Sequence, residues 1–215
     1  MSKSPRSYNQ FCAIAKALDI IGERWTLLIV RELLSGPKRF KDLQDSLPGI
    51  GTNLLSTRLK EMKKNGLLAK GKLPPPAASA VYEIAERGRE LEAVVSAIVK
   101  WGFSLLGTPN QDEFFRPHWA MQALLVTFDS DAAKEFSEIY EFHISDEIFY
   151  LRVHEGKAEG RLGPASHPDL VIIASVNELL TLGFGENQIE YALDKGLIKQ
   201  GTVEMLCRFI RIFGL

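Results

Sequence analysis

The segment GTNLLSTRLKEMKKNG, residues 51–66, decides how the first half of this chain is interpreted. Its apolar residues Leu55, Leu59 and Met62 recur at helical spacing, so one side of a helix packs on a core while the other meets solvent. The following Asn65-Gly66 pair is typical of a helix C-terminus. We therefore predict a helix over residues 52–64 whose polar side is free to contact another molecule.

Three helices are expected before this segment and a pair of strands after it. Apolar spacing predicts helices at 11–21, 25–34 and about 40–47. The strands are predicted at 67–73 and 80–85, joined by a proline-rich connection that can continue neither of them. Such a chain presents one helix to the major groove of DNA while the hairpin reaches the adjoining backbone. The fold class expected for this half is a mainly α winged-helix DNA-binding domain.

The exposed side of the 52–64 helix carries side chains that suit DNA. Asn53 can pair with an adenine edge, and the hydroxyl groups can donate to bases or phosphates. Lysine and arginine side chains on the helix, before it and on the hairpin would clamp phosphates, although each lysine could equally be a solvated surface charge. The predicted DNA-contacting residues are Arg39, Thr52, Asn53, Ser56, Thr57, Lys60, Lys63, Lys64, Lys70 and Lys72, and we expect Leu54 and Arg58 at the flank of the helix.

The two halves of the chain have opposite charge. Residues 1–107 hold 17 Lys+Arg and 10 Asp+Glu, a net charge of +7, whereas residues 108–215 hold 9 and 17, a net charge of −8. The turn-forming residues 107–112 mark the change. We predict two domains, 1–107 and 108–215, of which the first binds a polyanion and the second has another role. An uneven drift of charge along one chain is the simpler alternative.

A long helix is predicted from about Arg87 to Leu106. Its apolar residues, among them Val94, Ile98 and Trp101, cover more surface than one neighbouring helix would need. We expect part of this surface to meet a second subunit, which makes the protein a homodimer.

Residues 10–105 resemble the HxlR-type winged-helix regulators related to the MarR group. The resemblance rests on the run ALDIIGERWTLL at 17–28 and on the matches that follow it, namely Arg39-Phe40, Leu43, Pro48-Gly49-Ile50, Arg58-Leu59, Gly66-Leu67 and Tyr82. It implies a dimer that binds operator DNA through the helix at Thr52–Lys64 and the wing at Lys70–Ser79. The chain departs from the family where a serine usually opens the recognition helix, because it has Gly51 there, a slightly weaker cap.

Cys12 has two interpretations. Several members of the family use this cysteine to sense oxidants or electrophiles, so the resemblance makes Cys12 a candidate redox switch. Arg6 and Lys16 are close enough in sequence to stabilise a thiolate. The family often has proline after this cysteine, whereas this chain has Ala13. The favoured alternative is an inert thiol in the core, since cysteine is among the most buried residue types.

The second half predicts an α+β domain. Helices are expected at 118–128, 176–182, 188–194 and 203–213, and strands at 140–144, 149–153, 158–162, 169–174 and 197–200. We find no catalytic motif, and His118, His143, His154 and His167 lack metal-ligand spacing. We therefore expect no enzyme activity, no metal and no cofactor.

The same half resembles the sterol carrier protein type two fold. The resemblance rests on the strand pair Tyr140–Val153, the turn Glu155-Gly156-Lys157, Gly185-Glu186, and Asp194-Lys195-Gly196 with Gly201 before a final helix. It implies an apolar cavity for a lipid-like molecule. Aromatic and aliphatic residues that could line such a cavity, or simply form a core, are Tyr140, Phe142, Phe149, Leu151, Phe184, Phe209 and Phe213.

Together these patterns predict a cytoplasmic, sequence-specific transcriptional regulator. We expect it to repress transcription by binding an operator on double-stranded DNA, and we expect a small apolar ligand in the second domain to modulate this binding. The alternatives are a thiol-based redox regulator acting through Cys12 and a lipid carrier with an appended DNA-binding module. No segment approaches the ~20 apolar residues of a membrane span, so no membrane partner is expected.

Overall fold

The computed structural model describes residues 7–74, 78–107 and 113–215 and forms two compact units, Met1–Ile98 and Val99–Leu215. The predicted linker residues 108–112 and the predicted hairpin tip at 75–77 lie outside the described residues. The boundary at residue 107 stays a prediction.

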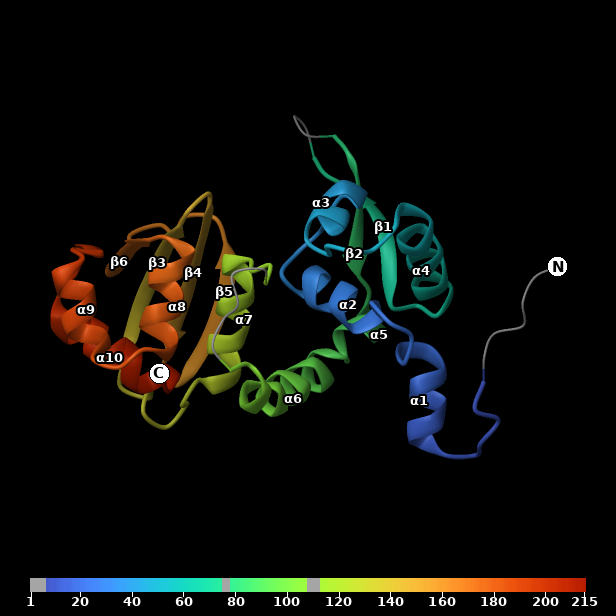
Figure 1. Ribbon diagram of the computed structural model, residues 1–215, viewed down its shortest axis with the longest axis horizontal. Coiled ribbons are helices and arrows are strands. Elements are labelled where there is room, and N and C mark those ends of the chain that lie inside the picture. Colours follow the sequence, from blue (N-terminus) through green and yellow to red (C-terminus); the bar gives the residue numbers. More distant parts are fainter. Residues whose placement is uncertain (1–6, 75–77, 108–112) are drawn as a thin grey trace. The chain divides into compact units, whose positions relative to one another are not determined.

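The first unit is a winged helix-turn-helix fold (Figure 1). Its helices are α1 (Ala13–Ile21), α2 (Thr26–Leu34), α3 (Phe40–Asp45) and α4 (Thr52–Lys64), followed by the antiparallel strands β1 (Leu68–Lys72) and β2 (Ala80–Ile84). Gly66, with φ +73°, ends α4 as the sequence predicts. Eleven buried apolar residues from α2, α3, α4, the turns beside them and the first residue of β1 form the core.

The predicted helix 87–106 is divided into three pieces. They are α5 (Glu86–Arg89), α6 (Glu92–Gly102) and the 3-10 turn η1 (Phe103–Leu105). The first break lies between Arg89 and Glu92, shortly after Gly88, which is so close to the Leu67 carbonyl that a Cβ there would sit 2.0 Å from its oxygen. Next to this poor helix former, Leu91 N–H donates to Gly88 O, a tighter turn than the α-helix uses.

The second unit is α+β with a mixed sheet. Its strands are β3 (Ser137–Ile144), β4 (Glu147–His154), β5 (Lys157–Leu162), β6 (Leu170–Ala174) and β7 (Ile198–Gln200), in the order β5-β4-β3-β6-β7. Only the β3–β6 pairing is parallel among the described strands. The helices are α7 (Pro117–Thr127), α8 (Val176–Phe184), α9 (Gln188–Asp194) and α10 (Val203–Phe213).

The core of the second unit lies on one face of this sheet. Alternate residues of β3 and β4 point into it, including Tyr140, Phe142 and Phe149, and helices α7, α8 and α10 supply the other side. Gly160 on β5 leaves room for Met121 of α7, whose side chain would lie 2.7 Å from a Cβ at that position. The predicted helices and strands of this half are confirmed within a few residues at their ends.

Candidate nucleic-acid interface

Helix α4 is anchored by one side. Leu55, Leu59 and Met62 are fully buried, as the sequence predicts. The side facing away from them carries Asn53, Thr57, Lys60 and Lys64, all exposed. A helix held in this way can approach a duplex without uncovering its own core.

The polar residues of α4 differ in how free they are. Thr52 and Lys63 are exposed, whereas Ser56 is partly buried. Thr52 Oγ1 accepts a hydrogen bond of 2.8 Å from Gln44 Nε2 of α3, which leaves its own hydrogen available. Thr57 Oγ1 instead donates to the Asn53 carbonyl at 2.9 Å. Thr57 is therefore less available as a phosphate donor than Thr52.

The wing presents two lysines on one face of β1. Lys70 and Lys72 are separated by one residue and are both exposed. The Lys70 ammonium lies 5.8 Å from the centre of the Tyr82 ring, which restricts where the lysine side chain can lie. Predicted wing residues 75–77 are outside the described residues.

The start of α3 is tied to the same wing. Lys38 and Tyr82 exchange two backbone hydrogen bonds, at 3.0 and 2.8 Å. Arg39 follows as an exposed residue at the start of α3, and its backbone N–H donates to Asp42 Oδ2 at 2.8 Å. The Arg39 side chain thus lies on a segment that is fixed to the hairpin and precedes the candidate recognition helix.

Sequence reasoning placed Arg58 wrongly at the flank of α4. Arg58 is only 9% exposed, and its guanidinium contacts Glu61 Oε2 at 2.7 Å and Glu23 Oε2 at 3.1 Å. It lies three residues after Leu55 and four before Met62, on the packed face. The helical spacing of Arg58 from Leu55 and Met62 could have predicted its burial. A buried charge needs a partner of opposite charge, which would have pointed to nearby glutamates.

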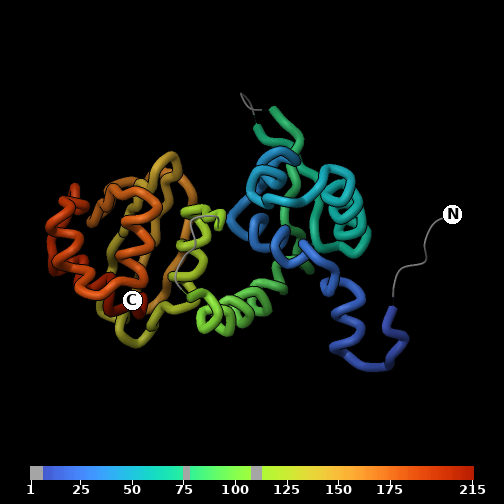
Figure 2. Tube along the Cα trace, in the orientation of Figure 1, coloured from blue at the N-terminus to red at the C-terminus, as the bar shows by residue number. Residues whose placement is uncertain are grey.

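Much of the apolar side of α1 is exposed, although Ile21 at its C-terminal end packs against the core of the unit. Phe11, Ile14 and Leu18 are 108%, 67% and 39% exposed. Figures 1 and 2 show α1 standing away from the other helices of this unit. Hydrogen bonds from Tyr8 N–H and the Ser7 hydroxyl lower the pKa of Asp19, and they hold the preceding segment along α1.

Cys12 is exposed at the N-terminal cap of α1, so the expectation of a cysteine buried in the core is wrong for this chain. Its apolar neighbour Phe11 is exposed too. Cys207 of α10 is also exposed.

Six of the seven residues named for a lipid-like ligand are packed against one another. Phe209 lies between Tyr140, Phe142 and Phe213, with ring centres 4.7 to 5.2 Å away. Tyr140, Phe142, Phe149, Leu151, Phe209 and Phe213 are all at most 3% exposed. They form the core of the second unit.

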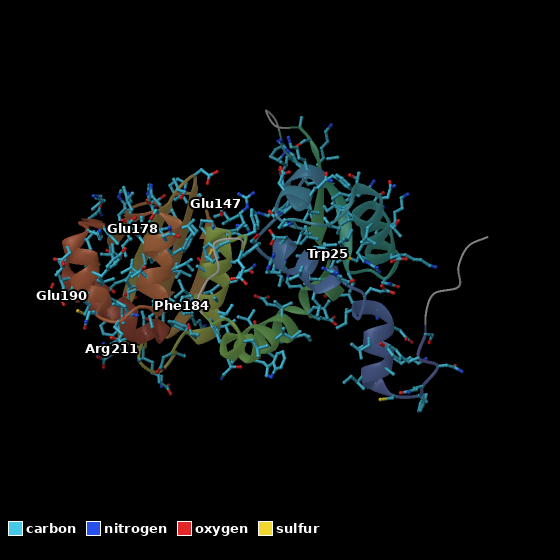
Figure 3. The ribbon with its side chains drawn as sticks, in the orientation of Figure 1. Trp25, Glu147, Glu178, Phe184, Glu190 and Arg211 are labelled. Atoms are coloured by element: carbon cyan, nitrogen blue, oxygen red, sulfur yellow. The ribbon has the colours of Figure 1, made fainter. Side chains whose placement is uncertain are left out.

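Phe184 differs, because it is 58% exposed at the end of α8 (Figure 3). An open hollow of about 470 Å³ lies beside the next helix, α9, and is lined by Asn187 to Asp194. Leu193 on that helix is 51% exposed. Apolar surface therefore remains accessible at α8 and α9.

Burial raises the pKa of the core hydroxyl of Tyr140, and the adjacent Glu138 carboxylate raises it further. The hydroxyl therefore stays protonated and donates to Glu138. Glu138 also pairs with Arg208 of α10 at 2.8 Å. This network satisfies the polar atoms at one end of the aromatic core.

Two further properties concern the described residues only. None of their helices is long and apolar enough to cross a membrane. Within the same residues, no group of three or more His, Cys, Asp or Glu side chains is placed to hold a metal ion.

Fold and site together define a winged helix-turn-helix unit that exposes a basic reading helix. Residues 20–109 match the model of the HxlR-like helix-turn-helix family. The chain is 34% identical over 94 residues to the HTH-type transcriptional regulator YodB of Bacillus subtilis, covering 43% of this chain and 84% of YodB. It is 35% identical over 86 residues to the regulator YvaP of the same organism, covering 40% of this chain and 80% of YvaP. This chain belongs to the HxlR-like helix-turn-helix family.

Solved structures of regulators are similar over the same part. The reduced form of YodB from B. subtilis shares 30% identity, covers 47% of this chain and 100% of that one, and gives a TM-score of 0.39. The redox regulator HypR in its reduced form shares 27% identity, covers 43% and 92%, and gives a TM-score of 0.40. The family model leaves residues 110–215 unmatched.

Proposed function

We propose that this protein is a homodimeric transcriptional regulator that represses by binding a specific operator on double-stranded DNA. The observation that carries the proposal is the geometry of α4, whose apolar side is buried while Asn53, Lys60 and Lys64 face outward. Exposed cations at Arg39, Lys70 and Lys72 flank the helix on neighbouring elements of the same unit. The remaining predicted contacts are Thr52, Ser56, Thr57 and Lys63.

The salt dependence of binding tests the phosphate contacts. Lys60→Gln should weaken binding to all duplexes alike and reduce the slope of log affinity against log salt by about one unit for each subunit bound, because each subunit releases one fewer counterion. Lys157→Gln is the matched control, since it removes an exposed lysine from the second unit. An unchanged slope in Lys60→Gln would remove Lys60 from the interface, and no salt-sensitive binding of the wild type to any duplex would end the proposal.

Dimerisation is proposed from the exposed apolar residues at α1 and α6. The exposed residues are Phe11, Ile14 and Leu18 at α1, and Val94, Ile98 and Trp101 on α6. No residue of α6 is buried. A second copy of the chain would cover these faces and would bring two α4 helices to a pseudo-palindromic site.

The second unit is proposed to sense a small apolar molecule and to resemble a sterol-carrier domain. Support comes from its separate core, from Leu193, which is exposed and lines the hollow at α9, and from the exposed Phe184 at the end of α8. Palmitate serves as the probe: operator affinity is measured without it and with a saturating, demonstrably bound amount. Because coupling is reciprocal, a change in operator affinity must be matched by a change in palmitate affinity on adding DNA. Bound palmitate with unchanged operator affinity would contradict the coupling.

A thiol switch at Cys12 is the second candidate function. It is favoured by the exposure of Cys12 at the start of α1, the helix that carries the proposed dimer face. Hydrogen peroxide should then change the operator affinity of the wild type and not that of Cys12→Ser. Cys207→Ser is the control, because Cys207 is exposed as well. A peroxide response that survives in Cys12→Ser would contradict this candidate.

A further inference from the structure

The turn between α1 and α2 is held in one shape. Gly22 ends α1, where a Cβ would lie 2.5 Å from the Leu18 carbonyl oxygen, and Thr26 N–H donates to Glu23 O at 3.1 Å. Trp25 has φ +79°, a left-handed conformation that a bulky residue adopts only where its surroundings impose it. Its side chain packs against the core of the unit, which supplies that constraint (Figure 3).

Glu23 in this turn contacts the recognition helix. Arg58 of α4 directs Nη2 to Glu23 Oε2 at 3.1 Å and Nη1 to Glu61 Oε2 at 2.7 Å. The two carboxylates differ in origin, because Glu61 lies on α4 itself, three residues after Arg58, whereas Glu23 lies 35 residues earlier in the chain. Of the two Arg58 contacts, the one with Glu23 therefore joins α4 to another element, as the hydrogen bond from Gln44 of α3 to Thr52 does at the start of the helix.

The chemistry of this contact differs from that of the apolar anchor. The burial of Leu55, Leu59 and Met62 decides which face of α4 meets the core, but apolar contacts depend less sharply on direction than a hydrogen bond does. A charged hydrogen bond from a planar guanidinium requires a defined direction. The Arg58 side chain is 10% exposed, so solvent competes little for its nitrogen atoms.

We infer that Arg58 is a positioning residue for DNA recognition, which sets the rotation of α4 about its axis through Glu23. The inference rests on the proposed function, since it assigns Arg58 a role in operator binding without contact to DNA. It also makes the α1–α2 turn the element through which a movement of α1 reaches α4. A small rotation of α4 would displace Asn53 from a base edge while lysines, with their long side chains, still reach phosphates.

The test compares two variants, each of which removes one of the two carboxylates that contact Arg58. Glu23→Gln removes the carboxylate on the turn, and Glu61→Gln removes the one on α4; their side chains are 42% and 53% exposed. Affinity is measured for the best duplex recovered from a random library and for a scrambled duplex of equal length. Because both variants lose one negative charge, their general electrostatic attraction to DNA changes alike.

We expect Glu23→Gln to lower the ratio of selected to scrambled affinity roughly two- to fivefold, the range for a partly exposed ion pair. Glu61→Gln should leave that ratio within error of the wild type. Glu23→Gln in an Arg58→Gln background should have no further effect on the ratio. If Arg58→Gln fails to fold, the two single glutamate variants decide by themselves.

Two results would overturn the inference, and they are distinct from failure of the proposed function. Equal ratios in Glu23→Gln and Glu61→Gln would show that the turn contact does not position α4. Loss of selected and scrambled binding by the same factor in Glu23→Gln would assign Glu23 to folding alone. A wild type that prefers no duplex would instead end the proposed function.

Discussion

The two units of this chain use their apolar residues differently. The second unit buries its aromatic side chains against one another, and Tyr140, Phe142 and Phe149 are at most 2% exposed. The first unit buries the centre formed by α2, α3 and α4 but exposes Ile14 on α1 and Ile98 on α6. A residue pattern typical of a core thus has two outcomes. Where other elements of the same unit cover the apolar residues they form a core, and elsewhere they stay exposed.

The largest expected effect is on the stability of the second unit, from a substitution in its aromatic core. Phe209→Ala should lower the free energy of unfolding of this unit by about 3–5 kcal/mol, because it empties space between three aromatic rings. Phe184→Ala is the control and should cost less than about 1 kcal/mol, since Phe184 is 58% exposed. Denaturant titration followed by hydrogen exchange in β3 and β4 measures both. Equal losses would contradict the distinction between core and surface.

The next effect tests the open faces of the first unit. Ile14→Glu should raise the dissociation constant of the proposed dimer by on the order of 100-fold, because it places an unpaired charge in an apolar interface. Lys16→Glu, an exposed change on the same helix, should leave it nearly unchanged. Sedimentation velocity over a concentration series measures the constant. An Ile14→Glu protein that associates like the wild type would remove α1 from the interface.

A smaller effect is expected at the outward side of α4. Asn53→Ala should relax the preference at one base pair of the selected duplex, at a cost of ~1–3 kcal/mol if Asn53 makes a bidentate contact. Binding to duplexes substituted at each position in turn locates the change. A uniform loss at all positions would indicate a backbone contact instead of base recognition.

The smallest effect is a dependence on pH confined to the second unit. Burial by itself would raise the pKa of Glu147 (Figure 3), but the hydrogen bonds and charges of His118 and Arg116 outweigh it and lower the pKa. The stability that Glu147 contributes is therefore present above its ordinary pKa of about 4.3 and is lost as pH falls through the lowered value.

Glu147→Gln should accordingly reduce the loss of stability of the second unit between about pH 5 and pH 3. Unfolding of this unit is followed at each pH, and the first unit of the same molecule is the internal control, because its pH profile should not change. A wild-type profile in Glu147→Gln would assign the acid sensitivity of the second unit to other groups.

The sequence by itself determined the order of the elements in both units. Leu55, Leu59 and Met62 fixed the face of α4 through helical periodicity, and alternation fixed β3 and β4, because such patterns depend only on local geometry. Local signals also located the ends of α4, and the family followed from the spaced matches around Trp25 and Arg58. The break between α5 and α6 was missed, and so was the close approach of Gly88 to Leu67, which is a contact between distant segments.

Only the tertiary structure decided which side chains meet across the chain. Burial of Arg58 beside Glu23 depends on residues 35 positions apart, and exposure of Cys12 depends on how the other described elements pack around the start of α1. The pattern of Phe209 allowed both a core and a ligand site, with a core as the commoner outcome, and the three rings around it place it in the core. Periodicity indicates on which face of a helix or strand an apolar residue lies. Which side chains pack against that face depends on distant segments of the chain.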